Sequence, residues 1–221
     1  MGGAAFSADF RQHTDQRILR SGEYEVEVSA ALRASLGPSE VFWDIGANTG
    51  YHSILIKSLI PSTQVVSFEP NPNVLFRLIE NLRINRFDCL SLPIALGAEI
   101  GVQTLHVIVR ENSGLTTLKP NNFRNYDFKL DTIVLTGDFV VENSLAPSPH
   151  TIKIDVEGSE FDVLKGMSGI LQNGSLRTII FEALNSQSLR EIGKYLERFY
   201  FTVPEPLDDA HNFISKSQRV K

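Results

Sequence analysis

The sequence contains one cysteine, Cys89, so the chain cannot form an internal disulfide bond, and nothing in it requires an oxidising compartment. It also lacks any cluster of lysine or arginine. The 21 basic residues are outnumbered by 26 acidic ones, which gives a formal net charge of -5. Proteins that bind the phosphate backbone of nucleic acids carry basic clusters. The composition therefore argues against nucleic acid as a partner.

Long apolar runs are missing as well. No run approaches the roughly 20 residues needed to span a bilayer, and the helical segment most like one is interrupted by Lys57. The first residues lack the basic start and apolar core of a secretory signal, and Phe6 stands where a myristoylation site requires Ser or Thr. We therefore expect a cytoplasmic protein without a membrane span.

The chain has 221 residues, enough for one domain with a sizeable core. We expect a polar leader over residues 1–23 and a single domain over residues 24–221. No internal repeat, low-complexity tract or linker divides the second segment.

Helix-like and strand-like segments alternate along this domain. Apolar spacing predicts helices at 24–36 and 51–60, and a third helix is capped by Asn71 with Pro72 at its first position. Short apolar runs predict strands at 41–45, 64–69, 89–95, 151–155 and 177–183. The alternation is typical of an α/β fold with a doubly wound, mostly parallel sheet covered on both faces.

The helix after Asn71 has an amphipathic pattern. Its predicted buried face carries Leu75, Leu78, Ile79 and Leu82. Its predicted solvent face carries Arg77, Glu80, Asn81 and Arg83.

Other segments depart from simple alternation. Residues 97–150 are predicted to form hairpins and loops inserted into the sheet order, with strand patterns at 103–109 and 131–135. Ser159 is predicted to cap a helix, and Ser188 with Glu191 forms a capping box for a later one. The segments YFTVP and HNFIS predict a terminal antiparallel strand pair.

A small-residue turn, Gly46-Ala47-Asn48-Thr49-Gly50, follows the first predicted strand. A dinucleotide site would need a glycine where Asn48 stands, and a phosphate-binding loop would need a following Gly-Lys-Ser/Thr. Asp44 just before the turn would repel a pyrophosphate but attract a cation. S-adenosylmethionine joins an adenosine to a cationic centre, so the turn favours this cofactor.

Glu69 ends the second predicted strand, about 20 residues beyond the turn, where an acid usually binds ribose hydroxyls. Taken alone, Asp44 or Glu69 is more often a solvated strand-end acid or a cap partner. Together with Gly46 and Gly50 on consecutive strand ends, they indicate a nucleotide-type cofactor.

Six segments resemble class I S-adenosylmethionine-dependent methyltransferases, and within them the FkbM-type family: YEVEV, DIGANTGYHS, FEPNP, IALGAEIG, IKIDVEGSEFDVLKGM and IIFEA. They follow the family order from Tyr24 to about Ala183. The resemblance implies a Rossmann-like fold and a cofactor site that includes Glu25, Asp44, Gly46, Ala47, Asn48, Gly50, Tyr51, Glu69, Pro70, Ala95 and Asp155.

The same resemblance implies individual roles. Asp44 and the turn would surround the methionine and ribose portion, and Glu69 would hold the ribose. Ala95 would lie by the adenine, Glu25 would face the methionine end, and Asp155 would close the site beneath the transferable methyl group.

Several acids lie at and just after the end of the predicted strand 151–155, in the segment KIDVEGSE. Methyl transfer to oxygen requires loss of a proton, which a nearby carboxylate can accept. We predict that Asp155 and Glu157 are catalytic, with a structural role for Glu157 as the alternative. Glu160 is interpreted as a first-turn helix acid, and Glu182 could converge on the cluster. Carboxylates also suit magnesium or calcium, but no histidine accompanies them in sequence, and we predict no metal.

The leading interpretation is an O-methyltransferase acting on a hydroxyl of a sugar, glycolipid or other secondary metabolite. A nicotinamide oxidoreductase is disfavoured by Asp44 and Asn48, and a catalytically silent cofactor-binding subunit by Asp155 and Glu157. His52 and His106 are interpreted as packing or surface residues. We expect segment 97–150 to select the acceptor through Asn112, Thr116, Asn121, Asn122, Phe123, Tyr126 and Phe128.

Overall fold

The computed structural model describes residues 3–109, 113–209 and 211–219. Its main sheet has seven strands in the order β3-β2-β1-β7-β8-β10-β9. In that order, these are Leu90–Leu92, Gln64–Phe68, Val41–Ile45, Thr151–Ile154, Thr178–Glu182, Asn212–Lys216 and Glu205–Pro206. The neighbouring strands β3, β2, β1, β7 and β8 pair in parallel, and β10 pairs antiparallel with both β8 and β9. The predicted doubly wound, mostly parallel sheet is confirmed.

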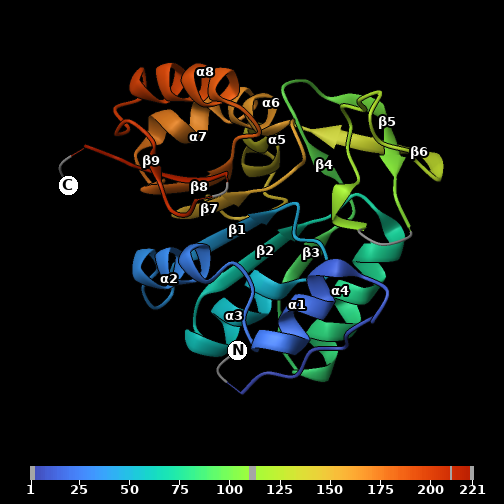
Figure 1. Ribbon diagram of the computed structural model, residues 1–221. Helices are drawn as coiled ribbons and strands as arrows, with labels where there is room; N and C mark the ends of the chain where they lie inside the picture. The colour runs from blue at the N-terminus through green and yellow to red at the C-terminus, as the bar shows by residue number, and fades with distance from the viewer. Residues whose placement is uncertain (1–2, 110–112, 210, 220–221) are drawn as a thin grey trace.

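Helices cover both faces of this sheet (Figure 1). One face carries α1 to α4, which are His13–Ser21, Val26–Ser35, Tyr51–Leu59 and Pro72–Ile84. The other carries α5 to α8, which are Gly137–Glu142, Glu160–Lys165, Ser168–Asn173 and Ser186–Glu197. Strand β1 is buried along its whole length, as the central strand of a sheet covered on both sides must be. Within the described residues, no helix has the length and apolarity to cross a membrane.

The inserted region forms a second sheet of three strands in the order β4-β6-β5. Strands β5 (Gly101–Val107) and β6 (Phe128–Leu135) form an antiparallel pair, and β4 (Ala95–Leu96) runs parallel to β6. The prediction of one strand over 89–95 is wrong, because the chain leaves the main sheet at β3 and enters the small sheet at β4. Pro93 lies between them and has no N–H to donate to a strand ladder.

The side chains that α4 buries differ from those predicted for its buried face. Ile79 is 45% exposed, whereas Asn81 is completely buried. Asn71 caps the helix as predicted, with its side chain accepting the Asn73 N–H at 3.1 Å. Asn81 is buried because residues from the amino-terminal segment cover this side of α4.

Three smaller expectations are corrected. The cap of α8 is Asn185, whose side chain accepts the N–H groups of Gln187 and Ser188, so the predicted capping box does not form. Ser159 precedes α6 but makes no capping hydrogen bond. The predicted antiparallel pair is present in part: residues 200–202 bond with residues 216–218 through the Phe201–Ser217 bridge and two flanking backbone hydrogen bonds, whereas the strand that pairs with β10 on this side is β9. The division at residue 23 stays a prediction, and the first segment contains helix α1.

Candidate functional site

The small-residue turn lies between β1 and α3 in a left-handed backbone conformation. Gly46, Asn48 and Gly50 have φ angles of 77°, 52° and 89°. Gly46 also packs against the chain that leaves β7, because a Cβ at this glycine would lie 1.9 Å from the carbonyl oxygen of Asp155. The turn therefore needs glycine both for its conformation and for a close backbone contact.

Glu69 fixes the shape of this turn. One carboxylate oxygen accepts the Asn48 N–H at 3.0 Å and the other accepts the Asn71 N–H at 2.9 Å. The side chain is 7% exposed, and burial raises its pKa to about 7. A carboxylate has about four acceptor positions, so two remain for hydroxyl groups in the adjoining cleft.

Asp44 lies behind the turn and is 1% exposed. Its Oδ2 accepts the Ser53 hydroxyl at 2.6 Å, and burial raises its pKa. Its Oδ1 has no hydrogen-bond partner among the described residues.

A cleft opens at the carboxyl ends of β1, β2 and β7. Seven of the predicted site residues line it: Gly46, Asn48, Glu69, Pro70, Ala95, Asp155 and Glu157. Its walls include the apolar side chains Ile94, Leu96, Leu105, Leu118 and Val156. The predicted residues Glu25, Asp44, Ala47, Gly50 and Tyr51 are outside this lining.

Glu25 and Tyr51 are still close to the cleft through Tyr24, which lines it. The Tyr24 N–H donates to the Tyr51 hydroxyl at 2.9 Å. Glu25 stands at the cap of α2 and lies 3.7 Å from His52 Nε2. Burial raises the pKa of Glu25 and lowers that of His52 well below its usual value. His52 is therefore neutral and packed, as predicted.

Sequence reasoning did not identify Ser159 as a cleft residue. Its side chain lines the cleft and is 4% exposed, yet its hydroxyl has no hydrogen-bond partner among the described residues. Buried hydroxyl groups are rarely left without partners in native proteins.

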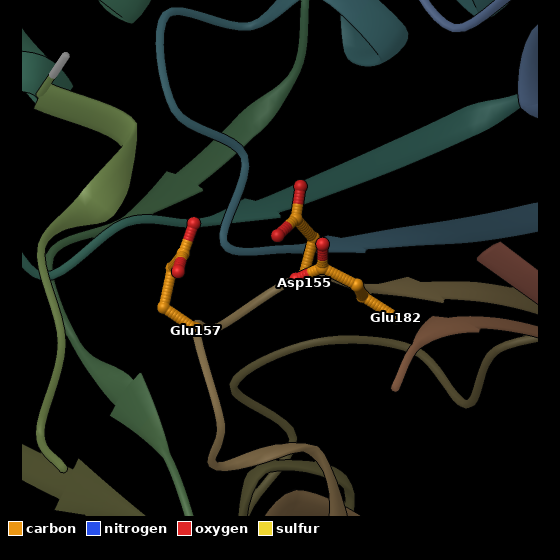
Figure 2. A group of neighbouring side chains, drawn as sticks. All are labelled: Asp155, Glu157 and Glu182. Carbon is orange, nitrogen blue, oxygen red and sulfur yellow. The ribbon is translucent and has the colours of Figure 1, made fainter. Parts of the chain in front are cut away.

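Figure 2 shows three carboxylates that converge beside the cleft: Asp155 after β7, Glu157 in the next turn and Glu182 at the end of β8. One carboxylate oxygen from each lies within 4.8 Å of the others. The predicted convergence of these acids is thus present in the structure. Oxygen ligands of this kind also suit hard cations, and the expectation of no metal stays a prediction.

The three acids have different surroundings. Glu157 has a positive φ of 54°, and its Oε2 accepts the Arg124 Nη1–H at 2.8 Å. Burial raises its pKa. Burial, together with the charges of Asp155 and Glu157, raises the pKa of Glu182 to about 9. These surroundings favour the protonated form of Glu182.

Sequence reasoning also missed Lys153 and Arg124. Lys153 is 4% exposed, and its ammonium group donates to Asp155 Oδ2 at 3.0 Å. Burial opposes its charge, but the nearby carboxylates of Asp155, Glu25 and Asp44 raise its pKa overall. Lys153 could have been found from the sequence, because a lysine inside the apolar strand TIKID is unusual. Nothing in the sequence indicated that Arg124 would pair with Glu157.

Glu160 has a structural role that its position only partly suggested. It begins α6, and its Oε1 accepts the N–H groups of Val156 and Gly158 at 3.2 and 3.0 Å. Burial raises its pKa to about 7. Glu160 therefore shapes the turn that carries Glu157.

The sequence from residue 44 to residue 203 matches the model of the methyltransferase FkbM domain. The chain belongs to the FkbM methyltransferase family. It is 28% identical over 202 residues to the hexuronic acid methyltransferase AglP of Haloferax volcanii, covering 87% of this chain and 77% of AglP.

Solved structures share its Rossmann-like methyltransferase fold. The precorrin-6y C5,15-methyltransferase of Geobacter metallireducens superposes with a TM-score of 0.55 at 14% identity, covering 97% of this chain and 94% of that one. TrmK of M. capricolum, in complex with S-adenosylhomocysteine, gives a TM-score of 0.51 at 12% identity, with 90% and 72% coverage. As a member of this methyltransferase family, the protein uses S-adenosylmethionine as its cofactor. The cleft suits that molecule, because apolar walls, the Glu69 carboxylate and an acidic cluster line or adjoin it.

Proposed function

We propose that this methyltransferase transfers the methyl group to a hydroxyl oxygen of a sugar, glycolipid or other secondary metabolite. The observation that carries the proposal is the cluster of Asp155, Glu157 and Glu182 at the cleft, because an attacking hydroxyl must lose a proton. The similarity to AglP, whose name gives a hexuronic acid as its substrate, supports a sugar acceptor.

The cofactor supplies an electrophilic methyl group when bound. In the proposed site, Glu69 holds the ribose hydroxyls, and Gly46 and Asn48 surround the methionine and ribose portion. Pro70 and Ala95 contribute to the wall around the adenosine. The other predicted residues act behind this surface. Ala47, Gly50 and Tyr51 shape the turn, and Asp44 and Glu25 place negative charge near the sulfonium.

In the proposed reaction, Glu157 accepts the proton of the acceptor hydroxyl. Arg124 orients the Glu157 carboxylate through their 2.8 Å hydrogen bond. Glu182, whose raised pKa favours the protonated form, can then donate a hydrogen bond to an acceptor oxygen. Lys153 holds Asp155 against the cofactor turn and balances part of the negative charge.

We propose that this reaction needs no metal, because Lys153 and Arg124 already offset two of the three acids, and the raised pKa of Glu182 favours its neutral form. Activity should then survive complete removal of divalent cations with a chelator. Loss of activity on chelation and its return with magnesium would instead assign Asp155, Glu157 and Glu182 to a metal centre.

The inserted region supplies the proposed acceptor surface. Thr116 lines the cleft, and Thr117 Oγ1 donates to the Glu157 carbonyl oxygen at 2.8 Å. Phe123 is 98% exposed and is available to stack on a sugar face. Of the residues predicted for this role, Asn112 lies outside the described residues.

This assignment is tested by replacing residues 97–150 with the equivalent segment of a family member that methylates a different acceptor. Acceptor preference should move with the segment while S-adenosylhomocysteine affinity stays the same. Preference that remains with the rest of the chain would place specificity elsewhere.

The overall proposal is tested by incubating the protein with methyl-labelled cofactor and a panel of neutral sugars, uronic acids and glycolipids. Label should appear in a sugar product. If the cofactor binds but no acceptor pool becomes labelled, a catalytically silent subunit is the better account. Selective binding of a nicotinamide dinucleotide would favour the oxidoreductase alternative.

A further inference from the structure

Helix α4 presents a polar stripe to the amino-terminal segment of the chain. Arg77, Asn81 and Asn85 follow one another at four-residue spacing and so share one face of the helix. Asn85 forms two hydrogen bonds of 2.7 Å with the backbone of Ala5, one to its N–H and one to its carbonyl oxygen. Asn81 Oδ1 accepts the Ser7 N–H at 2.7 Å. This face of α4 is therefore a docking surface rather than a solvent face.

An ion pair between Arg77 and Asp15 holds the next part of the segment. Asp15 is completely buried, and its Oδ2 also accepts the Asp9 N–H at 2.7 Å. A buried carboxylate without its cation would be strongly unfavourable, so the pair specifies where this segment sits. We call residues 5–16 the N-terminal strap.

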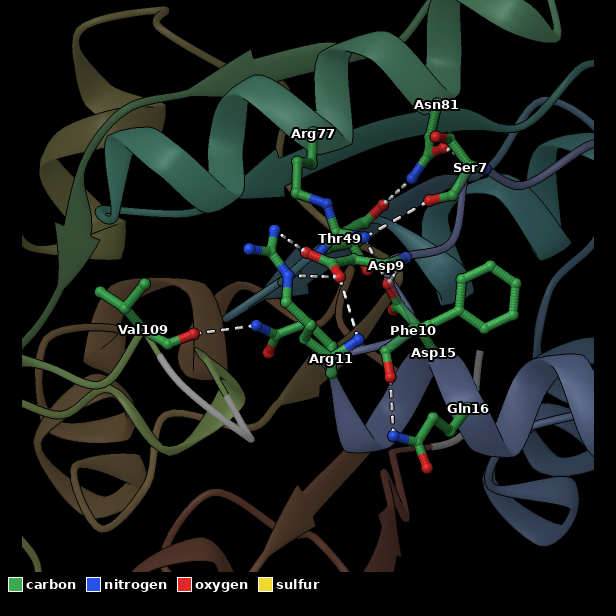
Figure 3. A network of polar contacts seen from close by, with 11 residues as sticks. Ser7, Asp9, Phe10, Arg11, Asp15, Gln16, Thr49, Arg77, Asn81 and Val109 are labelled. Atoms are coloured by element: carbon green, nitrogen blue, oxygen red, sulfur yellow. Dashed lines mark hydrogen bonds and ion pairs between the residues drawn. The ribbon is translucent and has the colours of Figure 1, made fainter.

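The buried Asn81 connects the N-terminal strap to the cofactor turn, as Figure 3 shows. While its Oδ1 accepts from Ser7, its Nδ2 donates to the Thr49 carbonyl oxygen at 2.9 Å. Thr49 lies between Asn48 and Gly50 in that turn. One amide thus fixes both segments, and displacement of either leaves a buried polar group without its partner.

The other end of the N-terminal strap reaches the inserted sheet. Gln12 Nε2 donates to the Val109 carbonyl oxygen, just beyond β5, at 2.9 Å. Thr14, in the first turn of α1, lines the cleft. The strap therefore passes from α4 to the inserted region and forms part of the cleft wall.

We infer that the N-terminal strap belongs to the S-adenosylmethionine site. Thr14 contacts the bound cofactor, and Arg77 and Asn81 are positioning residues that hold the strap and the turn in register. The strap precedes residues 44–203, the range that matches the family model. The inference rests on cofactor use and is independent of the proposed acceptor.

Hydrogen exchange of the unaltered protein, with and without S-adenosylhomocysteine, tests the inference first. Because the product would contact the strap and the turn together, backbone amides in residues 5–16 and 46–50 should both exchange more slowly when it is bound. Slower exchange in the turn with no change in the strap would overturn the inference.

The second test compares Arg77→Gln with Arg83→Gln. Arg83 lies on the same helix but pairs with Glu80 at the surface, where its side chain is 74% exposed. Arg77→Gln should release the strap, which faster trypsin cleavage after Arg11 would report. The affinity for S-adenosylhomocysteine should fall about tenfold, within the usual range for coupling between two sites. Arg83→Gln should change neither measurement.

Steady-state kinetics separate positioning from general destabilisation. With an acceptor identified by the labelling experiment, Arg77→Gln should raise KM for S-adenosylmethionine and leave KM for that acceptor unchanged, and Arg77→Lys should restore part of the lost affinity. A released strap with unchanged S-adenosylhomocysteine affinity would overturn the inference. If Arg77→Gln does not fold, two measurements still decide the inference: calorimetry of S-adenosylhomocysteine binding to Thr14→Val, and the exchange experiment on the unaltered protein.

Discussion

Gly46 and Asp155 touch through their backbones, so closely that a Cβ on Gly46 would lie 1.9 Å from the Asp155 carbonyl oxygen. The turn that follows β1 and the turn that follows β7 are therefore one rigid unit. Asp155 N–H also donates to the Ile45 carbonyl oxygen at 3.0 Å. Any shift of the cofactor turn will move the first acid of the cluster.

Gly46→Ala should disrupt this unit. A left-handed conformation alone costs a non-glycine residue about 1 to 2 kcal/mol, and the clash with Asp155 adds to that cost. We expect a lower melting temperature and loss of S-adenosylhomocysteine binding in calorimetry. Gly101→Ala is the control, because a Cβ there meets nothing within 4 Å. Normal binding by Gly46→Ala would show that the two turns can separate.

Glu69→Ala should weaken S-adenosylhomocysteine binding by about 1 to 3 kcal/mol, the usual loss when a hydrogen-bonded charged group is removed. The variant also leaves the N–H groups of Asn48 and Asn71 without their acceptor. Glu69→Gln keeps one of the two acceptor oxygens, so it should retain part of this support of the turn and weaken binding less than Glu69→Ala. Full affinity in a folded Glu69→Ala protein would refute the ribose assignment.

Glu157→Gln preserves the shape of the side chain but removes the proposed base. Loss of general-base assistance typically lowers a rate by about 10²- to 10⁴-fold, whereas cofactor affinity should stay the same. Single-turnover kinetics and calorimetry measure the two quantities separately. Wild-type turnover by this variant would make Glu157 structural and direct attention to Asp155 or Glu182.

The pKa of Glu182 predicts how stability depends on pH. Burial raises this pKa from 4.5 to about 9, so above pH 4.5 the unfolded chain releases a proton that the folded protein keeps. The free energy of unfolding should therefore fall as the pH rises toward 9. Glu69 and Glu160, with pKa values of about 7, contribute only to the lower part of this range.

Chemical denaturation of the wild type and of Glu182→Gln between pH 7 and 9 tests this assignment. The wild type should lose stability over this interval, and the variant, which cannot ionise at this position, should lose less. If the two proteins lose stability equally with pH, Glu182 is ionised over the whole interval, which would mean that burial and the neighbouring acids do not raise its pKa.

The sequence predicted the elements whose signals are local. The apolar run at 41–45, the turn from Gly46 to Gly50 and the Asn71 cap all appear where expected, because each depends on a few adjacent residues. The convergence of Asp155 and Glu182 was also predictable, since both follow parallel strands and such strands end at the same edge of a sheet.

The remaining features depend on contacts between distant segments. Asn81 has a polar side chain on the apparent solvent face of α4, and only its contacts with Ser7 and Thr49 explain its burial. The pairing of Arg124 with Glu157 joins residues 33 positions apart across an inserted loop. Neither pairing leaves a periodic pattern in the sequence.

The most direct test of the proposed function is the chemistry of the product formed with deuteromethyl-labelled S-adenosylmethionine and a sugar acceptor. Mass spectrometry should find one labelled methyl group, and treatment with mild alkali should leave it in place, because an ether at a former hydroxyl resists hydrolysis. A label lost under mild alkali would show methylation of a carboxyl group instead. That result, or no transfer to any sugar, would contradict hydroxyl methylation.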